Sequence, residues 1–314
     1  MRVLRLALAA VVSLAVISAP AVPSLAAGYP LNPKTNIPPP AYVYGGACAA
    51  APTSRDCTSL WVRALDDARA AMGQPAYALP SRFRSLTAKE RLLVLADQDR
   101  RLYGRVPISG LNQTLDQSAY GGVVNDRDPY FVYSLHGFPL RGGGANWAGG
   151  SAPMNNPLFA YYLWMYDDGP GSGNVDCRQA GDPGCWGHRD GTLGGWGTDT
   201  KVLLGASGGS GRNFGYAWTE LFEAFSNSAA IPLVPTVQGM LRHSGRPGDV
   251  VQVNGFGLYH ATQVTVVGRS ATIQSRHANS LTVKVPAGVG AGWVVVHTDG
   301  GVSNRTDAAA FSYA

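Results

Sequence analysis

Apolar positions recur at helical spacing in the N-terminal half of the chain. The residues that carry the first pattern lie three or four positions apart: Leu60, Trp61, Ala64, Leu65 and Ala68. They predict a helix from Thr58 to about Met72. A second helix should begin at Thr87, because Glu90 follows three residues later in the capping-box pattern. Gly104 should end it.

A third pattern is the apolar-aromatic run LFAYYLWMY, which predicts the end of a buried helix. The Gly, Pro, Ser and Asn residues that follow cannot continue a helix, so Asp167 and Asp168 should lie where it breaks. Further along, Lys201–Ala206 and Asn213–Phe222 favour strands around a glycine-rich turn. The segment GGGANWAGG before the run can adopt any backbone shape.

The pattern changes after Ile231–Pro235, where short β-rich runs alternate with turn residues. The runs are Val250–Asn254, Gln263–Val267, Ser280–Val285 and Trp293–His297. Short strands at fairly even intervals indicate a small antiparallel β-sandwich. A helical first domain and an all-β second domain are therefore expected.

The first 26 residues have the pattern of a secretory signal peptide. Arg2 and Arg5 precede a short apolar core, and Ser24-Leu25-Ala26 has the form of a cleavage site. No other segment has the length of a transmembrane helix. We therefore expect a secreted, extracellular protein without a membrane span. Residues 27–56, rich in Pro, Ala and Gly, are expected to form an extended surface linker.

The four cysteines suit an oxidising compartment and allow three disulfide connectivities. The local solution, Cys48–Cys57 and Cys177–Cys185, closes two short loops and is favoured. A zinc site that uses all four cysteines is the alternative, although no Cys-x-x-Cys spacing is present. The net charge of +5 comes without a block of Lys or Arg, so it does not indicate a nucleic-acid partner.

The chemistry-bearing residues concentrate between Trp164 and Leu193. A disulfide between Cys177 and Cys185 would fold the loop back and could bring His188 close to Asp167 and Asp168. An acid beside an imidazole can bind a metal ion or transfer a proton. The alternative is structural: the acids cap and solubilise a loop, and His188 is a packed, hydrogen-bonded side chain.

Two motifs in this stretch resemble the CAP superfamily of secreted proteins and its bacterial SCP-like relatives. Trp164–Asp168 is similar to the tryptophan-aromatic-acid-acid turn of that family, and Gly187–Leu193 to its Gly-His motif. Residues 92–122 resemble the opening helices of a CAP domain. The resemblance implies an α-β-α sandwich over 57–230. Residues 235–314 resemble an IPT/TIG immunoglobulin-like domain, so the expected fold class is α+β.

The resemblance also implies a site, because CAP domains that bind metal use two histidines and two acids. His188 and Asp168 match one of each. The usual Gly-Glu-Asn motif is replaced by Gly144-Ala145-Asn146, which lacks the carboxylate, and His136 is the only candidate for the second histidine. Loss of these ligands favours a groove without zinc. Its lining would come from six residues: Asn146, Trp147, Asp167, Asp168, Trp186 and His188.

The sequence therefore predicts a secreted, monomeric, non-enzymatic CAP-domain protein of the cell envelope without a cofactor. Its partner would be a glycan, a lipid or an extracellular protein, with the IPT/TIG domain as an interaction module or spacer. The alternative is a hydrolase, such as a metal-assisted peptidase with zinc, that uses His188 and Asp168. A third possibility is that the sandwich alone carries adhesion.

Ser207 lies in a Gly-x-Ser-x-Gly pattern, but no helix follows it as a serine hydrolase requires.

Overall fold

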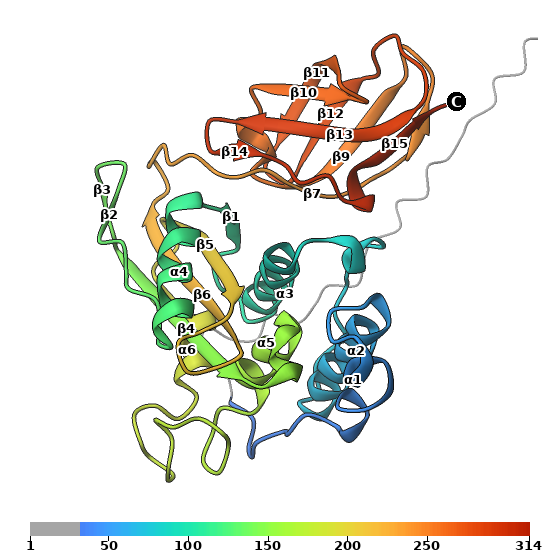
Figure 1. Ribbon diagram of the computed structural model, residues 1–314. Coiled ribbons are helices and arrows are strands. Elements are labelled where there is room, and N and C mark those ends of the chain that lie inside the picture. The colour runs from blue at the N-terminus through green and yellow to red at the C-terminus, as the bar shows by residue number, and fades with distance from the viewer. Residues whose placement is uncertain (1–31) are drawn as a thin grey trace, which may run out of the picture.

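The computed structural model describes residues 32–314, which form two adjoining units (Figure 1). The first contains helices around a small sheet, and the second is built from strands. The expected mixed α+β class is confirmed. The expected signal peptide, residues 1–26, lies outside the described residues, as does the linker up to residue 31.

The first unit has one four-stranded sheet in the order β1-β5-β6-β4, in which β1 pairs in parallel with β5 and the other pairs are antiparallel. The strands are β1 Ile108–Leu111, β4 Gly142–Gly150, β5 Thr200–Gly209 and β6 Tyr216–Ser226, with a separate hairpin of β2 Ser134–Leu135 and β3 Phe138–Pro139. The helices are α1 Gly46–Ala50, α2 Arg55–Ala71, α3 Ala88–Leu102, α4 Gln113–Asn125, α5 Pro157–Tyr166 and α6 Gly187–Leu193. Short 3-10 turns are η1 Ala41–Val43, η2 Phe83–Ser85 and η3 Ala152–Asn155.

Helices cover both faces of this sheet. Alternate residues of a strand point to opposite faces. On β5, Leu203 packs with Leu115 of α4, whereas Val202 and Leu204 belong to the core formed with α2, α3 and α5. The result is three layers, with α4 on one side and α3 and α5 on the other (Figure 1).

Local capping explains where the helices begin. The Ser54 side chain accepts the N–H of Cys57 at the start of α2, and Thr87 and Glu90 form the expected capping box of α3. Asn156 caps α5, whose first residue is Pro157. These side chains satisfy N–H groups that have no partner inside the helix. The predictions for α3 and for the break of α5 at Tyr166 are confirmed, and α2 begins three residues before its predicted start.

Within the described residues 32–56, the expectation of an extended surface linker is wrong. The segment contains η1 and α1, and the side chains of Val43 and Cys48 are buried in the first core. Both local disulfides are formed, Cys48–Cys57 and Cys177–Cys185. The first disulfide ties α1 to α2, so this segment is part of the first unit.

The second unit is a curled sheet in which β7-β9-β12-β11-β10-β13-β15-β8 surround one apolar core, with β14 paired to β13. Its strands are β7 Thr236–Met240, β8 Ser244–Gly245, β9 Val250–Phe256, β10 Gln263–Val266, β11 Arg269–His277, β12 Ser280–Lys284, β13 Ala291–Thr298, β14 Gly301–Val302 and β15 Ala310–Tyr313, with η4 Leu258–His260 and η5 Asp307–Ala309 between them. All four predicted runs form strands. The pattern did not predict β7, β8, β11, β14 and β15, of which β11 is the longest and has no buried residue.

The two units pack against each other. The N–H of Val234 donates to the carbonyl of Leu111 beside the sheet of the first unit. Phe256 and Ala308, both from the second unit, are buried in the core of the first. Buried apolar contacts of this kind hold the sandwich in a fixed position rather than on a free tether.

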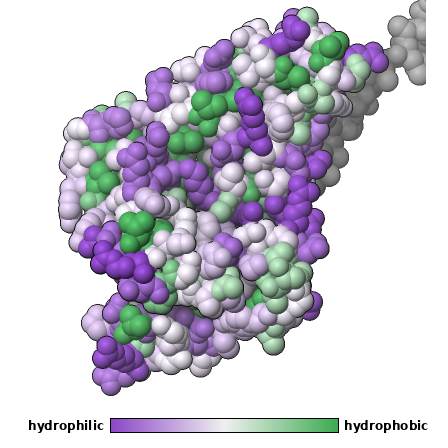
Figure 2. Space-filling view, in the orientation of Figure 1, coloured by the Kyte–Doolittle hydropathy of each residue, from purple (hydrophilic) through white to green (hydrophobic). Residues whose placement is uncertain are grey.

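On the face seen in Figure 2, hydrophobic residues lie in small groups separated by hydrophilic ones over both units. A large continuous apolar patch, which would mark a partner or membrane surface, is not visible on this face. No helix among residues 32–314 has the length and apolar character needed to cross a membrane.

Candidate functional site

The candidate site lies at the free edge of β4, where α5 ends and α6 begins. β4 is the last strand of its sheet, so alternate backbone groups on its outer side have no strand partner. The carbonyl of Trp147 accepts a hydrogen bond from Nε1 of Trp164 at 3.1 Å. The N–H of Trp147 interacts with the carboxylate of Asp128 and acts to lower its pKa. These contacts gather α5 and the segment after α4 at one strand edge.

Asp168 and His188 form the centre of the site. Nδ1 of His188 lies 2.7 Å from Oδ1 of Asp168, and the N–H of His188 donates to Oδ2 of the same carboxylate at 3.0 Å. The Asp168 side chain is 3% exposed and that of His188 is 19% exposed. The acid and the imidazole that the sequence singled out are therefore in direct contact.

The disulfide loop holds Asp168 from its other side. Nδ2 of Asn174 donates to Oδ1 of Asp168 at 2.8 Å and to the carbonyl of Gly184 at 2.9 Å. The N–H of Trp186 donates to the Asp168 carbonyl. Cys177 and Cys185 close the loop between these contacts. Asp168 therefore receives three donors on its carboxylate and has a fixed position.

The outer nitrogen of His188 is accessible. Within residues 32–314, Nε2 has no hydrogen-bond partner, and it is not one of the buried polar atoms that lack a partner. It therefore faces solvent. Burial lowers the pKa of His188, but the hydrogen bond with Asp168 and the charges of Asp168, Asp128 and Asp176 more than offset it, so the pKa is raised. At neutral pH a larger fraction of this imidazole is protonated than of a free one.

Asp128 is the residue that the sequence interpretation missed. It is exposed, and it follows α4 on the opposite side of the sheet from α6. Partial desolvation raises the pKa of its carboxyl, while the charge of His188 and the N–H of Trp147 act in the opposite direction. Asp128 thus interacts with both Trp147 and His188 and connects the edge of β4 with α6.

An aromatic pair flanks this cluster. The ring of Trp147 lies 5.2 Å from that of Phe214, centroid to centroid, at an interplanar angle of 64°. Gly149 gives the Trp147 ring its space, because a Cβ at that position would lie 2.4 Å from the ring. Asp126 fixes the loop beside Phe214 by accepting the N–H and Nδ2 of Asn213 at 2.6 and 2.9 Å. Nε1 of Trp147 is buried and has no hydrogen-bond partner among residues 32–314.

Two residues expected in the groove do not line an open surface. Asn146 is fully buried, and its Nδ2 donates to Oγ1 of Thr192 at 2.9 Å. Trp186 is buried and precedes α6 with a positive φ of 63°. Asn146 thus joins β4 to α6, whereas the Trp186 ring lies against Gly169 in the loop after α5. Their contact with a ligand stays a prediction, and in this structure both side chains are buried.

Asp167 points away from the Asp168–His188 pair. Burial and then the charge of Asp168 raise its pKa, and Asp167 in turn raises the pKa values of Tyr44 and Tyr162. These tyrosines lie on the side of α5 that faces α1 and α2. The two neighbouring acids therefore interact with different groups: Asp167 with Tyr44 and Tyr162, and Asp168 with His188. Only Asp168 belongs to the site.

The expected metal ligands do not come together. His136 lies in the turn of the β2–β3 hairpin with a positive φ of 51°, and its side chain is exposed. Within residues 32–314, no group of three or more His, Cys, Asp or Glu side chains has a geometry that could hold a metal ion. The ligand set of His188, Asp168 and His136 is therefore wrong, and only the first two are in contact.

Comparisons with known proteins assign no family. No protein-family model matches the chain, and no curated protein matches it. A solved γ-CGTase from alkalophilic Bacillus clarkii shares 19% identity over 30% of this chain and 14% of its own, with a TM-score of 0.24. An auxiliary nutrient binding protein from Bacteroides thetaiotaomicron shares 17% identity over 26% of this chain and 21% of its own, with a TM-score of 0.23. SGBP-B from a xyloglucan utilization locus in Bacteroides uniformis shares 18% over 35% of each chain, with a TM-score of 0.21. The matches span about a third or less of those chains, and at such TM-scores they define neither fold nor function.

Proposed function

We propose that this is an exported binding protein of the cell envelope and that its first unit, a CAP-type domain, binds a glycan at the free edge of β4. The observation that carries the proposal is the contact of Asp168 with His188, whose Nε2 is accessible, near the strand edge that carries the Trp147–Phe214 pair. It joins an aromatic surface to carboxylate and imidazole groups in one small area. That combination suits a sugar, which offers an apolar ring face together with hydroxyl groups.

The individual groups have complementary roles in such a complex. Phe214 is 38% exposed and packs on Trp147, so it can stack against a sugar ring. The Asp128 carboxylate and Nε2 of His188 can bond hydroxyl groups. The partnerless indole N–H of Trp147 is a donor whose burial is costly unless an oxygen of a ligand or of water accepts it.

We assign the first unit to the CAP superfamily and the second unit to the IPT/TIG domains on the basis of sequence motifs. The two CAP-like motifs lie at the end of α5 and the start of α6, and their acid and histidine are in contact. Two disulfides and the N-terminal leader pattern support export. The sandwich would then present the CAP-type unit at a fixed angle.

The test is calorimetric titration with soluble fragments of cell-wall polysaccharide, together with cosedimentation with the insoluble polymer. Phe214→Ala should weaken binding about tenfold, since an aromatic contact contributes about 0.5–1.5 kcal/mol beyond its buried area. Tyr259→Ala is the matched control, because Tyr259 is an exposed aromatic residue of the second unit. Equal affinity of all three proteins, or the absence of any glycan binding, would reject the proposal.

The geometry also favours a second candidate, a hydrolase without a metal ion. Asp168 orients His188 through Nδ1, and the free Nε2 could take a proton from water. His188→Ala should abolish turnover of a glycan or peptide substrate in that case while the far-UV circular dichroism stays unchanged. Binding that survives this substitution, without turnover in the wild type, would leave the binding protein as the function.

A further inference from the structure

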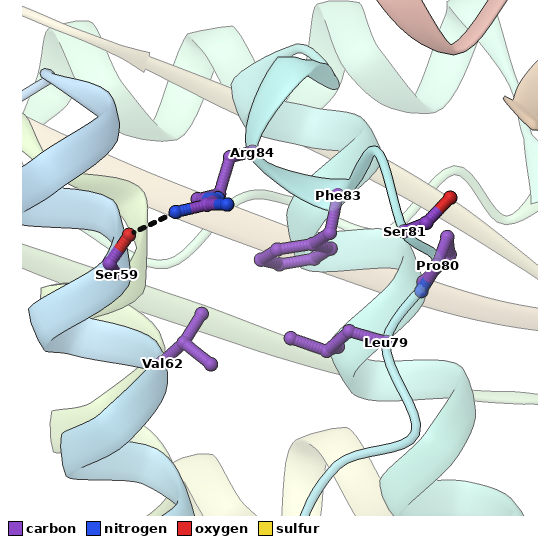
Figure 3. A pocket seen from close by; sticks show the side chains of 7 residues that line it. All are labelled: Ser59, Val62, Leu79, Pro80, Ser81, Phe83 and Arg84. Atoms are coloured by element: carbon purple, nitrogen blue, oxygen red, sulfur yellow. Dashed lines mark hydrogen bonds between the residues drawn. The ribbon is translucent and has the colours of Figure 1, made fainter.

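A small cavity of about 220 Å³ lies on the outer side of the helical layer, away from the edge of β4. It opens between α2 and the segment 79–84, which includes the start of η2 (Figure 3). Its walls come from Ser59 and Val62 of α2 and from five residues of that segment, Leu79, Pro80, Ser81, Phe83 and Arg84.

The floor of the cavity is apolar. Figure 3 shows the side chains of Val62, Leu79 and Phe83 pointing toward one another across the space. Phe83 is 3% exposed and belongs to the first core, whereas Val62 and Leu79 pack against that core from outside. A rigid residue of the core therefore forms the base, and the two partly exposed side chains form the sides.

One end of the cavity carries a positive charge without an acidic partner. Nη1 of Arg84 donates to Oγ of Ser59 at 2.8 Å, which holds the guanidinium at the rim (Figure 3). Among residues 32–314, no carboxylate pairs with Arg84, whereas Arg55 and Arg63 on the same face of α2 pair with acids. A guanidinium has five N–H donors, so most of those of Arg84 are free for an anion.

We propose that this cavity binds a small organic carboxylate that carries one short, branched apolar group. A volume of about 220 Å³ is sufficient for a branched chain of five or six carbons. The apolar group occupies the space between Val62, Leu79 and Phe83. The carboxylate bonds Arg84 in the two-pronged geometry that a guanidinium favours. This site is independent of the proposed glycan site.

The test is a titration of the ¹⁵N-labelled protein with 4-methylpentanoate, followed by amide chemical shifts, beside its neutral isostere 4-methylpentanamide. We expect shifts confined to residues around 59–62 and 79–85, with a dissociation constant on the order of 1 mM for a ligand of this size. The amide should bind at least about tenfold more weakly, because it lacks the charge that pairs with Arg84.

Two variants and one control complete the experiment. Arg84→Gln should weaken binding of the acid about tenfold and abolish the preference for acid over amide. Val62→Phe should block the cavity and remove binding of both compounds. Arg82→Gln, a matched change at an exposed arginine that does not line the cavity, should alter affinity less than twofold. The proposal is overturned if 10 mM acid shifts no amide near the cavity, if acid and amide bind equally, or if Arg82→Gln is as damaging as Arg84→Gln.

Discussion

Replacing Asp168 by Asn should destabilise the protein by an amount that depends on pH. The carboxylate receives three donors, from Nδ1 and the backbone N–H of His188 and from Nδ2 of Asn174. An amide keeps one acceptor oxygen but turns an NH₂ group toward a donor and loses the charge. The side chain is nearly inaccessible, so water cannot replace the lost partner.

The magnitude follows from the number and kind of these contacts. A hydrogen bond to a charged group contributes about 1.5–3 kcal/mol, and a buried donor left without an acceptor costs about 1–3 kcal/mol. With one carboxylate oxygen effectively removed, we expect a loss of about 2–4 kcal/mol near pH 6. Near pH 9, where the imidazole is neutral, the loss should be smaller by about 1–2 kcal/mol.

The sign of this pH dependence comes from His188. Its pKa is raised in the folded state, since the hydrogen bond and charge of Asp168 outweigh the effect of burial. The folded state therefore holds a proton that the unfolded state has released. This stabilisation is complete below the ordinary histidine pKa of about 6.5 and is lost as pH rises through the higher folded value. Asp168→Asn removes it, so the two proteins differ most at low pH.

Urea unfolding at pH 6 and pH 9, with a proton NMR titration of the His188 ring, measures both quantities. Asp167→Asn is the control, because this neighbouring acid faces Tyr44 and Tyr162 instead. It should leave the His188 pKa almost unchanged. An Asp168→Asn protein that loses the same stability at both pH values, or that keeps the wild-type His188 pKa, would refute the role assigned to this pair.

Further predictions concern residues around the same sheet. Burial raises the pKa of Glu223 to about 7, so wild-type stability should fall by about 3 kcal/mol between pH 4.5 and 7. Glu223→Gln should remove that fall in urea titrations at several pH values. Serine at both Cys177 and Cys185 opens a short loop and should cost about 3 kcal/mol in thermal unfolding. Gly144→Ala would place a Cβ 2.1 Å from the carbonyl oxygen of Gly191, and circular dichroism should show a melting temperature lower by more than about 5 °C.

Local signals explain which parts of the fold the sequence could predict. The start of α3 was predictable because Thr87 and Glu90 satisfy each other and the helix N–H groups within four residues. The two disulfides were predictable because each joins cysteines fewer than ten residues apart. The burial of Cys48 was not, since it lies in a core formed with residues of α2, α3 and α5 from farther along the chain.

The site shows the same division. Asp168 and His188 could be paired from sequence because the first follows the end of one helix and the second lies in the first turn of another, with a closed loop between them. Asp128 carried no signal, because its interactions with the N–H of Trp147 and with His188 join residues that lie far apart in the sequence.

Two glutamates of β6 show why the burial of charge is the hardest feature to read from a strand pattern. Glu220 and Glu223 lie an odd number of residues apart, so they face opposite sides of the sheet, and alternation alone would expose at least one of them. Both are fully buried. Glu220 lies opposite Asn146, and burial raises its pKa well above the ordinary value, with a smaller contribution from the charge of Asp99 on α3. The Asn146 side chain acts in the opposite direction and lowers this pKa, but the effect of burial outweighs it. The sheet therefore tolerates this acid because helices from distant parts of the chain keep it protonated.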